Sequence, residues 1–238
     1  MPLRTGKTLL TQQEAAKRLG VNQSTVSRLL HANTLEPASR SNGRNVYVTA
    51  ESVIRYSQQR HAKGRPLSPE SAMGLLLILS RKNAEWLDKQ QRHRVHVCLK
   101  TASPGEIAWK TRSRATTVRL RTFPSNMRRI RECSMDGGVT DETVGRRFGL
   151  PQKAGMLECY TAETTLRKLM ADRMVREADS SNVTMHVISD RMFDLLREHG
   201  GIPVAVCAVD LMESSEPREY ATGAEQLEYL LNEWRERA

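Results

Sequence analysis

The feature that most constrains the fold is a glycine between two short segments of helical periodicity. The sequence from Gln12 to His31 reads QQEAAKRLGVNQSTVSRLLH, and Gly20 separates the two segments. Glycine adopts a positive φ without strain, which a sharp turn between helices requires, and Asn22 is a favourable N-cap for the second segment. The apolar residues of both segments recur at the spacing of one helix face: Ala15, Ala16, Leu19, Val26, Leu29 and Leu30. Two helices that cross at a tight turn are therefore predicted.

This arrangement resembles the helix-turn-helix motif, in which a small residue (Ala16) is followed four positions later by glycine and six after that by a β-branched residue (Val26). The outward face of the second helix carries side chains that pair with base edges or phosphates: Gln23, Ser24, Thr25, Ser27, Arg28 and His31. A merely solvated helix would also be polar, but the net charge of +10 favours a polyanionic partner. We therefore expect this helix to bind double-stranded DNA.

A basic hairpin is predicted after the second helix. Asn42-Gly43 is the strongest two-residue hairpin signal, because both positions tolerate a positive φ, and short extended runs flank it. Arg40 and Arg44 lie near the predicted tip, where they suit a contact with phosphates or with the minor groove.

A third helix, capped by Thr49 and running over residues 50–60, completes the first predicted domain, residues 1–60. The order helix, turn, helix, basic wing, helix is similar to excisionase and MerR-like winged domains over residues 8–60. The resemblance implies a second helix in the major groove and a wing on the adjacent backbone. By position it assigns Gln23, Ser24, Thr25 and Arg28 to the groove and Arg40 and Arg44 to the wing. Residues 61–69 are basic and rich in Gly and Pro, which predicts a linker in place of the dimerisation helix of MerR activators.

Residues 70–238 mix helical and alternating patterns, which predicts an α+β fold class with a mixed second domain. Ser68 and Pro69 favour the start of a buried helix, and Asp88 with Gln91 forms a capping-box pattern ahead of another. Beyond Pro104 the helical pattern gives way to shorter pieces. Strands are expected over 116–123, 156–160 and 183–188, and helices over 125–133, 140–148, 161–170 with Thr161 as cap, and 221–237. Residues 200–212 fit either a buried strand or a buried helix, and the helix is favoured because Pro203 suits a first turn.

The strand over 116–123 has a basic outer face, formed by Arg119 and Arg121. Seven arginines lie between residues 112 and 131: Arg112, Arg114, Arg119, Arg121, Arg128, Arg129 and Arg131. We expect a second nucleic-acid surface here, with a site for an acidic protein or a solvated face as the alternatives. A homodimer that places two heads on paired half-sites is the other way to gain contacts with DNA.

The C-terminal segment carries a second resemblance, to AbiE-type antitoxins. In these an apolar helix ends in an Asp-Leu-hydrophobic-Glu-Ser-x-x-Pro-Arg turn, here Asp210, Leu211, Met212, Glu213, Ser214, Pro217 and Arg218. The segment RPLSPESAMGLLLILS, with Trp86 downstream, is similar to actinobacterial proteins that join such a tail to an excisionase-like head. The resemblance covers most of residues 64–235. It implies an autorepressor encoded beside a nucleotidyltransferase-type toxin, and not an enzyme.

No catalytic, cofactor or metal site is predicted. His93 and His96 are three residues apart, but no cysteine or carboxylate joins them at ligand spacing. The four cysteines lie far apart, which is typical of buried thiols in a reducing cytoplasm. Asp210 and Glu213 are interpreted as closing a helix end. The longest apolar stretch, Met73–Leu79, is too short to span a membrane.

These observations predict a cytoplasmic, sequence-specific transcriptional repressor, with an autoregulating antitoxin as the preferred setting. The second domain is expected to add DNA contacts, to bind a partner such as a cognate toxin, or to dimerise. The alternatives are an excisionase-like accessory factor for recombination or plasmid maintenance, and a regulator that responds to a small molecule.

Overall fold

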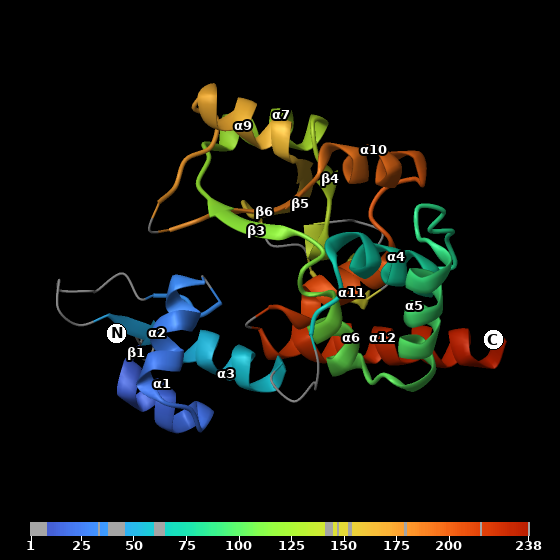
Figure 1. The fold of residues 1–238 in the computed structure, drawn as a ribbon. Coiled ribbons are helices and arrows are strands. Elements are labelled where there is room, and N and C mark those ends of the chain that lie inside the picture. The colour runs from blue at the N-terminus through green and yellow to red at the C-terminus, as the bar shows by residue number, and fades with distance from the viewer. Residues whose placement is uncertain are drawn as a thin grey trace. The chain divides into compact units, whose positions relative to one another are not determined.

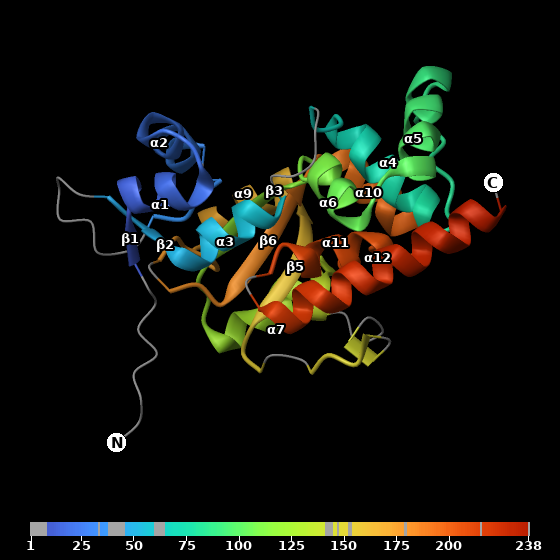
Figure 2. The same cartoon turned by 90° about the horizontal axis from the view of Figure 1, so that it is seen from below.

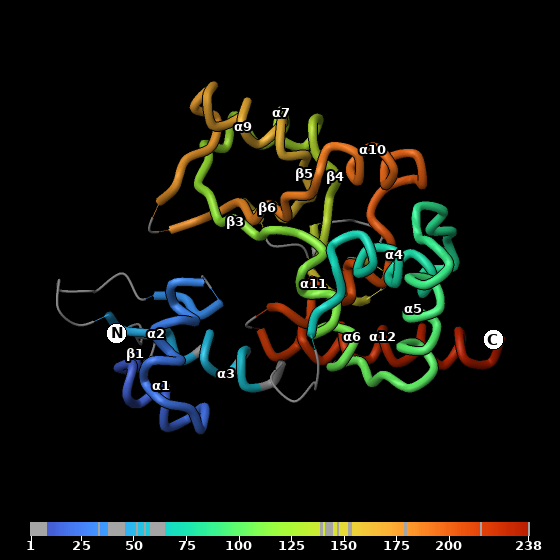
Figure 3. Tube along the Cα trace, viewed as in Figure 1, coloured from blue at the N-terminus to red at the C-terminus, as the bar shows by residue number. Residues whose placement is uncertain are grey.

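The computed structural model divides the chain into two compact units, Met1–Lys63 and Gly64–Ala238. It describes residues 9–32, 34–37, 46–59, 65–140, 145–146, 148–151, 154–178, 180–214 and 216–237 (Figures 1 and 3). The second unit combines helices with a sheet of four strands, and the α+β fold class predicted from the sequence is confirmed. Within the described residues, no helix is both long enough and apolar enough to cross a lipid bilayer.

The described residues of the first unit form three helices and a small antiparallel sheet. Its elements are β1 (Leu9–Thr11), α1 (Gln12–Leu19), α2 (Gln23–His31), β2 (Tyr47–Thr49) and α3 (Ala50–Gln59). Strand β1 pairs with β2, and this pairing brings the start of α1 close to the start of α3. The apolar side chains of the three helices form one buried cluster with Leu35 and Val48 at its centre, both fully buried.

The second unit is built from eight described helices and four strands. The helices are α4 (Pro69–Leu79), α5 (Lys89–Thr101), α6 (Pro104–Thr111), α7 (Pro124–Glu132), α9 (Glu163–Ala171), α10 (Asp190–Glu198), α11 (Val204–Met212) and α12 (Pro217–Arg237). The strands are β3 (Thr116–Leu120), β4 (Met135–Asp136), β5 (Leu157–Ala162) and β6 (Val183–Ile188), and a 3-10 turn, η1 (Gly138–Thr140), follows β4.

The sheet has the order β3-β6-β5-β4. Strands β5 and β6 are parallel and are connected through α9, as the trace in Figure 3 shows, whereas both outer pairings are antiparallel. Side chains alternate between the faces of a strand. One face is apolar and packs against α7 and α9 (Figure 1), with Ile130 and Leu169 from these helices in the same buried cluster as Met185. The other face, which includes Tyr160, joins the main core of the unit.

That main core is made largely of helices. Helix α4 is apolar on nearly all sides and is buried around its circumference, as its sequence predicts. Figure 2 shows α11 and α12 running close together, and Gly223 of α12 permits this packing because a Cβ there would lie 2.5 Å from the carbonyl oxygen of Ala208.

Several expected elements differ from the structure. Helices α6 and α10 were not predicted; Ser103 and Glu106 form the capping box of α6, with Pro104 in its first turn, where proline is tolerated. Thr161 as a helix cap is wrong: it is a buried residue of β5, and Ala162 is the N-cap of α9.

Two other expectations concern partly described segments. The helix expected over residues 140–148 lies largely outside the described residues. Part of the expected linker packs onto the second unit, because the amide of Leu67 donates to the carbonyl of Lys110 at 2.9 Å and Ser113 donates to the carbonyl of Leu67.

Candidate functional site

The connection between α1 and α2 is a tight turn centred on Gly20. This glycine has a φ of 61°, in the left-handed region that a sharp turn between two helices requires. The amide of Val21 donates to the carbonyl of Ala16 at 3.0 Å, which closes the end of α1. Asn22 then begins α2, since its Oδ1 accepts the amide hydrogen of Thr25 at 2.9 Å. The turn is therefore stabilised at both of its ends.

Packing fixes which side of α2 faces solvent. Val26 is fully buried and Leu30 nearly so, and both belong to the cluster that contains Ala15 and Ala16 of α1. Small side chains on α1 allow the two helices to approach closely. Because the inward residues recur at helical spacing, the opposite side of α2 is left as a continuous polar face.

Six of the ten residues predicted to contact DNA lie on α2. Gln23, Ser24, Arg28 and His31 are exposed, whereas Thr25 and Ser27 are half-buried. Residues 9–61 match the family model of the helix-turn-helix domain. No curated protein and no solved structure matches the chain. The helix-turn-helix domain indicates a DNA-binding regulator, and in such domains the second helix enters the major groove.

Within the helix-turn-helix domain, hydrogen bonds already occupy some of the polar groups. The hydroxyls of Ser24 and Thr25 both donate to Asn22 Oδ1, at 2.9 Å and 2.6 Å. Each hydroxyl has a single proton, so in this arrangement it can accept a hydrogen bond from DNA but cannot donate one. Arg28 uses one of its five N–H groups, on Thr25 Oγ1 at 3.2 Å. Gln23 and Arg28 are therefore the residues best able to donate to base edges.

His31 is oriented by its own helix. Its Nδ1 lies 2.7 Å from the carbonyl oxygen of Ser27, and a carbonyl only accepts, so Nδ1 carries a proton. The Nε2 atom is then the part of the ring left for another partner. Among the six residues, His31 is thus held in one orientation before any ligand binds.

The predicted wing of the helix-turn-helix domain is described only at its base. Pro37 and Val48 form an antiparallel bridge, so the chain leaves and returns side by side. The Asn42-Gly43 hairpin, with Arg40 and Arg44, lies outside the described residues.

Arg119 lies in β3, an outer strand of the sheet of the second unit, and Arg121 follows directly after it. Both are exposed, and Leu120 between them is buried, as the alternating pattern predicts. Arg121 donates to the hydroxyl of Ser180 and is thereby anchored to the loop before β6. Arg119 lies opposite Thr184 in the pairing of β3 with β6.

The seven arginines between residues 112 and 131 do not form a single surface. Arg114 is only 3% exposed, so its assignment to a nucleic-acid surface is wrong. Arg112 stacks on Trp109, with its guanidinium carbon 3.6 Å from the ring centroid. The arginines of α7 lie on the helix that covers the opposite face of the sheet from Arg119. Arginines that are close together in the sequence therefore lie on different parts of the second unit.

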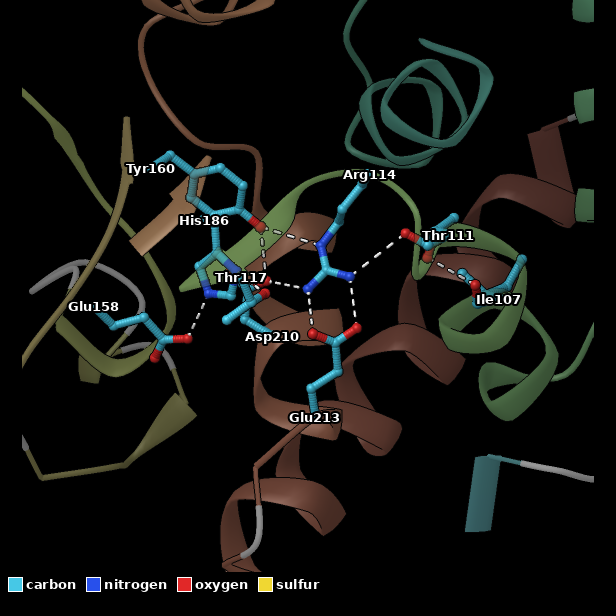
Figure 4. A network of polar contacts seen from close by, with 9 residues as sticks. All are labelled: Ile107, Thr111, Arg114, Thr117, Glu158, Tyr160, His186, Asp210 and Glu213. Atoms are coloured by element: carbon cyan, nitrogen blue, oxygen red, sulfur yellow. Dashed lines mark hydrogen bonds and ion pairs between the residues drawn. The ribbon is translucent and has the colours of Figure 1, made fainter. Parts of the chain in front are cut away.

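Arg114 is the centre of a buried polar network (Figure 4). Its Nη2 donates to Asp210 Oδ1 at 2.5 Å and to Glu213 Oε2 at 2.8 Å, and its Nη1 donates to Glu213 Oε1 at 2.7 Å. Its Nε donates to the hydroxyl of Tyr160 at 3.1 Å, and this hydroxyl donates to Asp210 Oδ1 at 2.7 Å. Burial by itself would lower the pKa of Arg114, but the negative charges of Glu213 and Asp210 raise it, so the guanidinium stays charged.

His186 extends the network across the sheet. Its ring stacks on Tyr160 with centroids 4.7 Å apart, its Nε2 lies 2.9 Å from Glu158 Oε1, and its Nδ1 lies 3.0 Å from Thr117 Oγ1. Burial alone would lower the pKa of His186, whereas the negative charges of Asp210 and Glu158 raise it above the usual value.

Sequence reasoning missed this network. Glu213 is indeed the C-cap residue of α11, but its side chain and that of Asp210 bind Arg114, so closing a helix end is not their main role. A signal was present in the strands: Glu158 is the carboxylate of the run LECYTA, and His186 is the imidazole of the run VTMHVI. A charge within a buried strand requires a partner.

Proposed function

We propose that this protein is a sequence-specific transcriptional repressor that reads its operator with α2. The observation that carries the proposal is the helix-turn-helix match over residues 9–61. The exposed polar face of α2 supports it, because Gln23 and Arg28 supply the amide and guanidinium groups that pair with adenine and guanine in the major groove. The net charge of +10 supplies the attraction to the phosphate backbone.

One helix-turn-helix domain reads only a few base pairs, so tight binding needs more contacts. The wing arginines Arg40 and Arg44 are proposed to contact the backbone. Further contacts come either from Arg119 and Arg121 or from a second copy of the protein on a paired half-site. Sedimentation of the saturated complex distinguishes these cases: two chains on a palindromic site indicate a dimer, and one chain with a longer footprint indicates the second unit.

The test starts from the full-length protein and a selection of genomic fragments at physiological salt. Affinity for the enriched site is then measured by fluorescence anisotropy for the wild type and for Gln23→Ala and Arg28→Ala. A lost base contact is worth about 1–3 kcal/mol, so we expect each variant to bind the operator roughly 5- to 150-fold more weakly, and Arg28→Ala to lose preference at one base pair.

Arg191→Ala is the matched control, because it removes an exposed arginine from α10 in the second unit. It should lower affinity for all sequences equally, if at all. Unchanged operator binding by both α2 variants would show that α2 does not read the groove.

The biological setting we propose is that of an autoregulating antitoxin. It rests on the likeness of residues 64–235 to AbiE-type antitoxins and on the turn from Asp210 to Arg218. Repression of a reporter driven by the protein's own promoter, together with co-purification of the neighbouring gene product, is the expected result. Sharp DNA bending in a gel-shift assay without repression would instead identify an accessory factor for recombination.

A further inference from the structure

One carboxylate oxygen in the network around Arg114 lacks a hydrogen-bond partner among the described residues. It is Asp210 Oδ2, on a side chain with no solvent exposure. An unsatisfied buried carboxylate oxygen is costly, and such atoms in native structures require an explanation. One explanation lies close by, because Glu158 and His186 each offer a metal-ligating atom within 4.8 Å of one from Asp210.

We propose that Glu158, His186 and Asp210 form a binding site for one divalent transition-metal ion. The three residues come from β5, β6 and α11, and their ligand atoms all lie within 4.8 Å of one another. The distance of 2.9 Å between His186 Nε2 and Glu158 Oε1 fits adjacent ligands of one ion, since two bonds of about 2.1 Å at a right angle place their ligand atoms about 3 Å apart.

The charges of the network match a divalent ion. Glu213 binds Arg114 through both of its carboxylate oxygens and so neutralises the guanidinium. Within this group of residues the negative charges of Asp210 and Glu158 are left. An imidazolium at His186 would supply one positive charge, whereas a divalent ion supplies two and leaves the imidazole neutral, as a metal ligand must be.

Outer contacts already hold the proposed ligands in place. Asp210 Oδ1 accepts hydrogen bonds from Arg114 and Tyr160, which fixes the carboxylate and leaves Oδ2 for the ion. Thr117 Oγ1 lies 3.0 Å from His186 Nδ1 and can accept a hydrogen bond from a proton on Nδ1, which leaves the lone pair of Nε2 for the metal. Partners of this kind orient metal ligands and raise their affinity.

The backbone leaves space at this point. A Cβ at Gly138 would collide with the Glu158 carboxylate, and a Cβ at Gly137 would lie 3.1 Å from the ring of Tyr160. The Gly137-Gly138 pair therefore leaves room for the Glu158 carboxylate and the Tyr160 ring. An ion can reach the site from solvent at Glu158, because the Glu158 side chain is 24% exposed, whereas the side chains of His186 and Asp210 are buried.

The ligand set selects the class of metal. One imidazole and two carboxylates, without a thiolate, suit Zn²⁺ or Mn²⁺ and do not suit Cu⁺. Mg²⁺ prefers oxygen ligands and several waters, so it should bind far more weakly. We therefore expect zinc and manganese to bind and magnesium not to compete with them.

The test uses full-length protein freed of metal with a chelator and dialysed against Zn²⁺. One ion per chain should bind, and Glu158→Gln and His186→Gln should each lower the affinity at least about tenfold. Glu132→Gln and His93→Gln are matched controls that remove an exposed carboxylate and an imidazole elsewhere. Manganese, followed by its electron paramagnetic resonance signal, should show the same pattern.

Folding of each variant is checked by the urea midpoint of its tryptophan fluorescence. Thr117→Val keeps all three ligands and removes only the hydroxyl beside His186, so it should bind zinc about tenfold more weakly with an unchanged midpoint. The proposal is overturned if the wild type binds no zinc, or if folded Glu158→Gln and His186→Gln bind it as tightly as the wild type. Loss of zinc in His93→Gln alone would place the ion on the surface of α5.

Discussion

The side chain of Arg114 stabilises the protein only as part of a group with Asp210 and Glu213. Replacing Arg114 with methionine removes one buried positive charge, so the carboxylates of Asp210 and Glu213 lose their contacts with the guanidinium. Breaking a buried ion pair in this way costs about 3–5 kcal/mol. We therefore expect Arg114→Met to lower the free energy of unfolding of the second unit by this amount, measured by urea denaturation.

Tryptophan fluorescence is the appropriate probe, because Trp86, Trp109 and Trp234 are the three tryptophans of the chain and all lie in the second unit. Arg112→Met is the matched control, since Arg112 is exposed and stacks on Trp109. It should change the free energy of unfolding by less than about 1 kcal/mol. Equal effects of the two substitutions would contradict the role given to Arg114.

The Cys159 thiol should be unreactive in the folded protein. Burial raises its pKa to about 12, so at pH 8 only about one thiol in 10⁴ is a thiolate. Cys98 and Cys133 are only half-buried. Peptide mapping after brief alkylation at pH 8 should find label on these two before Cys159, and equal labelling of all in urea. Rapid labelling of Cys159 without denaturant would show that β5 is accessible.

For single residues, the sequence predicts solvent exposure better than it predicts which side chains contact one another. The alternation of Arg119, Leu120 and Arg121 correctly predicts which side chains face solvent. Nothing local to Arg114 distinguishes it from its neighbours, because its partner Asp210 lies 96 residues away. A contact of this kind depends on the tertiary fold, and local periodicity carries no information on it.

Two helix glycines of the second unit should respond oppositely to alanine. At Gly223 of α12 the new Cβ would lie 2.5 Å from the carbonyl oxygen of Ala208, so α11 and α12 must move apart. At Gly105 of α6 a Cβ would meet no atom within 4 Å. We expect Gly223→Ala to destabilise the unit by about 1–3 kcal/mol, and Gly105→Ala to stabilise it by about 0.5 kcal/mol.

Urea denaturation followed by tryptophan fluorescence measures both glycine variants under the same conditions. Each variant is thus the control for the other, since the chemical change is identical. A stabilising effect at Gly223 would mean that α11 and α12 can separate at little cost.

Helices α2 and α4 were predicted from a capping residue followed by an apolar helical pattern, whereas α6 was missed despite its capping box. Asn22 and Ser68 cap α2 and α4 as expected. Helix α6 was missed because Pro104 and Gly105 usually interrupt helices, yet here they occupy the first turn, where neither breaks an internal hydrogen bond. The capping box in the same four residues was the stronger signal.

For the whole molecule, every buried apolar cluster of the described residues lies inside a single unit. One cluster belongs to Met1–Lys63, and three belong to Gly64–Ala238. Each unit therefore has a hydrophobic core of its own, and a change in one core should affect the stability of that unit first. A linker over residues 61–69 is expected from the Gly- and Pro-rich stretch, a change in composition that requires no knowledge of tertiary contacts.

Substitutions in the two cores test this independence. Leu35→Ala removes a fully buried side chain of the first unit and should lower its free energy of unfolding by about 2–5 kcal/mol. Faster amide exchange in α2 would report this loss, while the tryptophan midpoint in urea stays unchanged. Leu76 of α4 is equally buried, so Leu76→Ala should lower the tryptophan midpoint in urea and leave amide exchange in α2 unchanged. If Leu35→Ala shifted the tryptophan midpoint as far as Leu76→Ala does, the units would unfold as one, and substitutions in either would alter DNA binding through global stability.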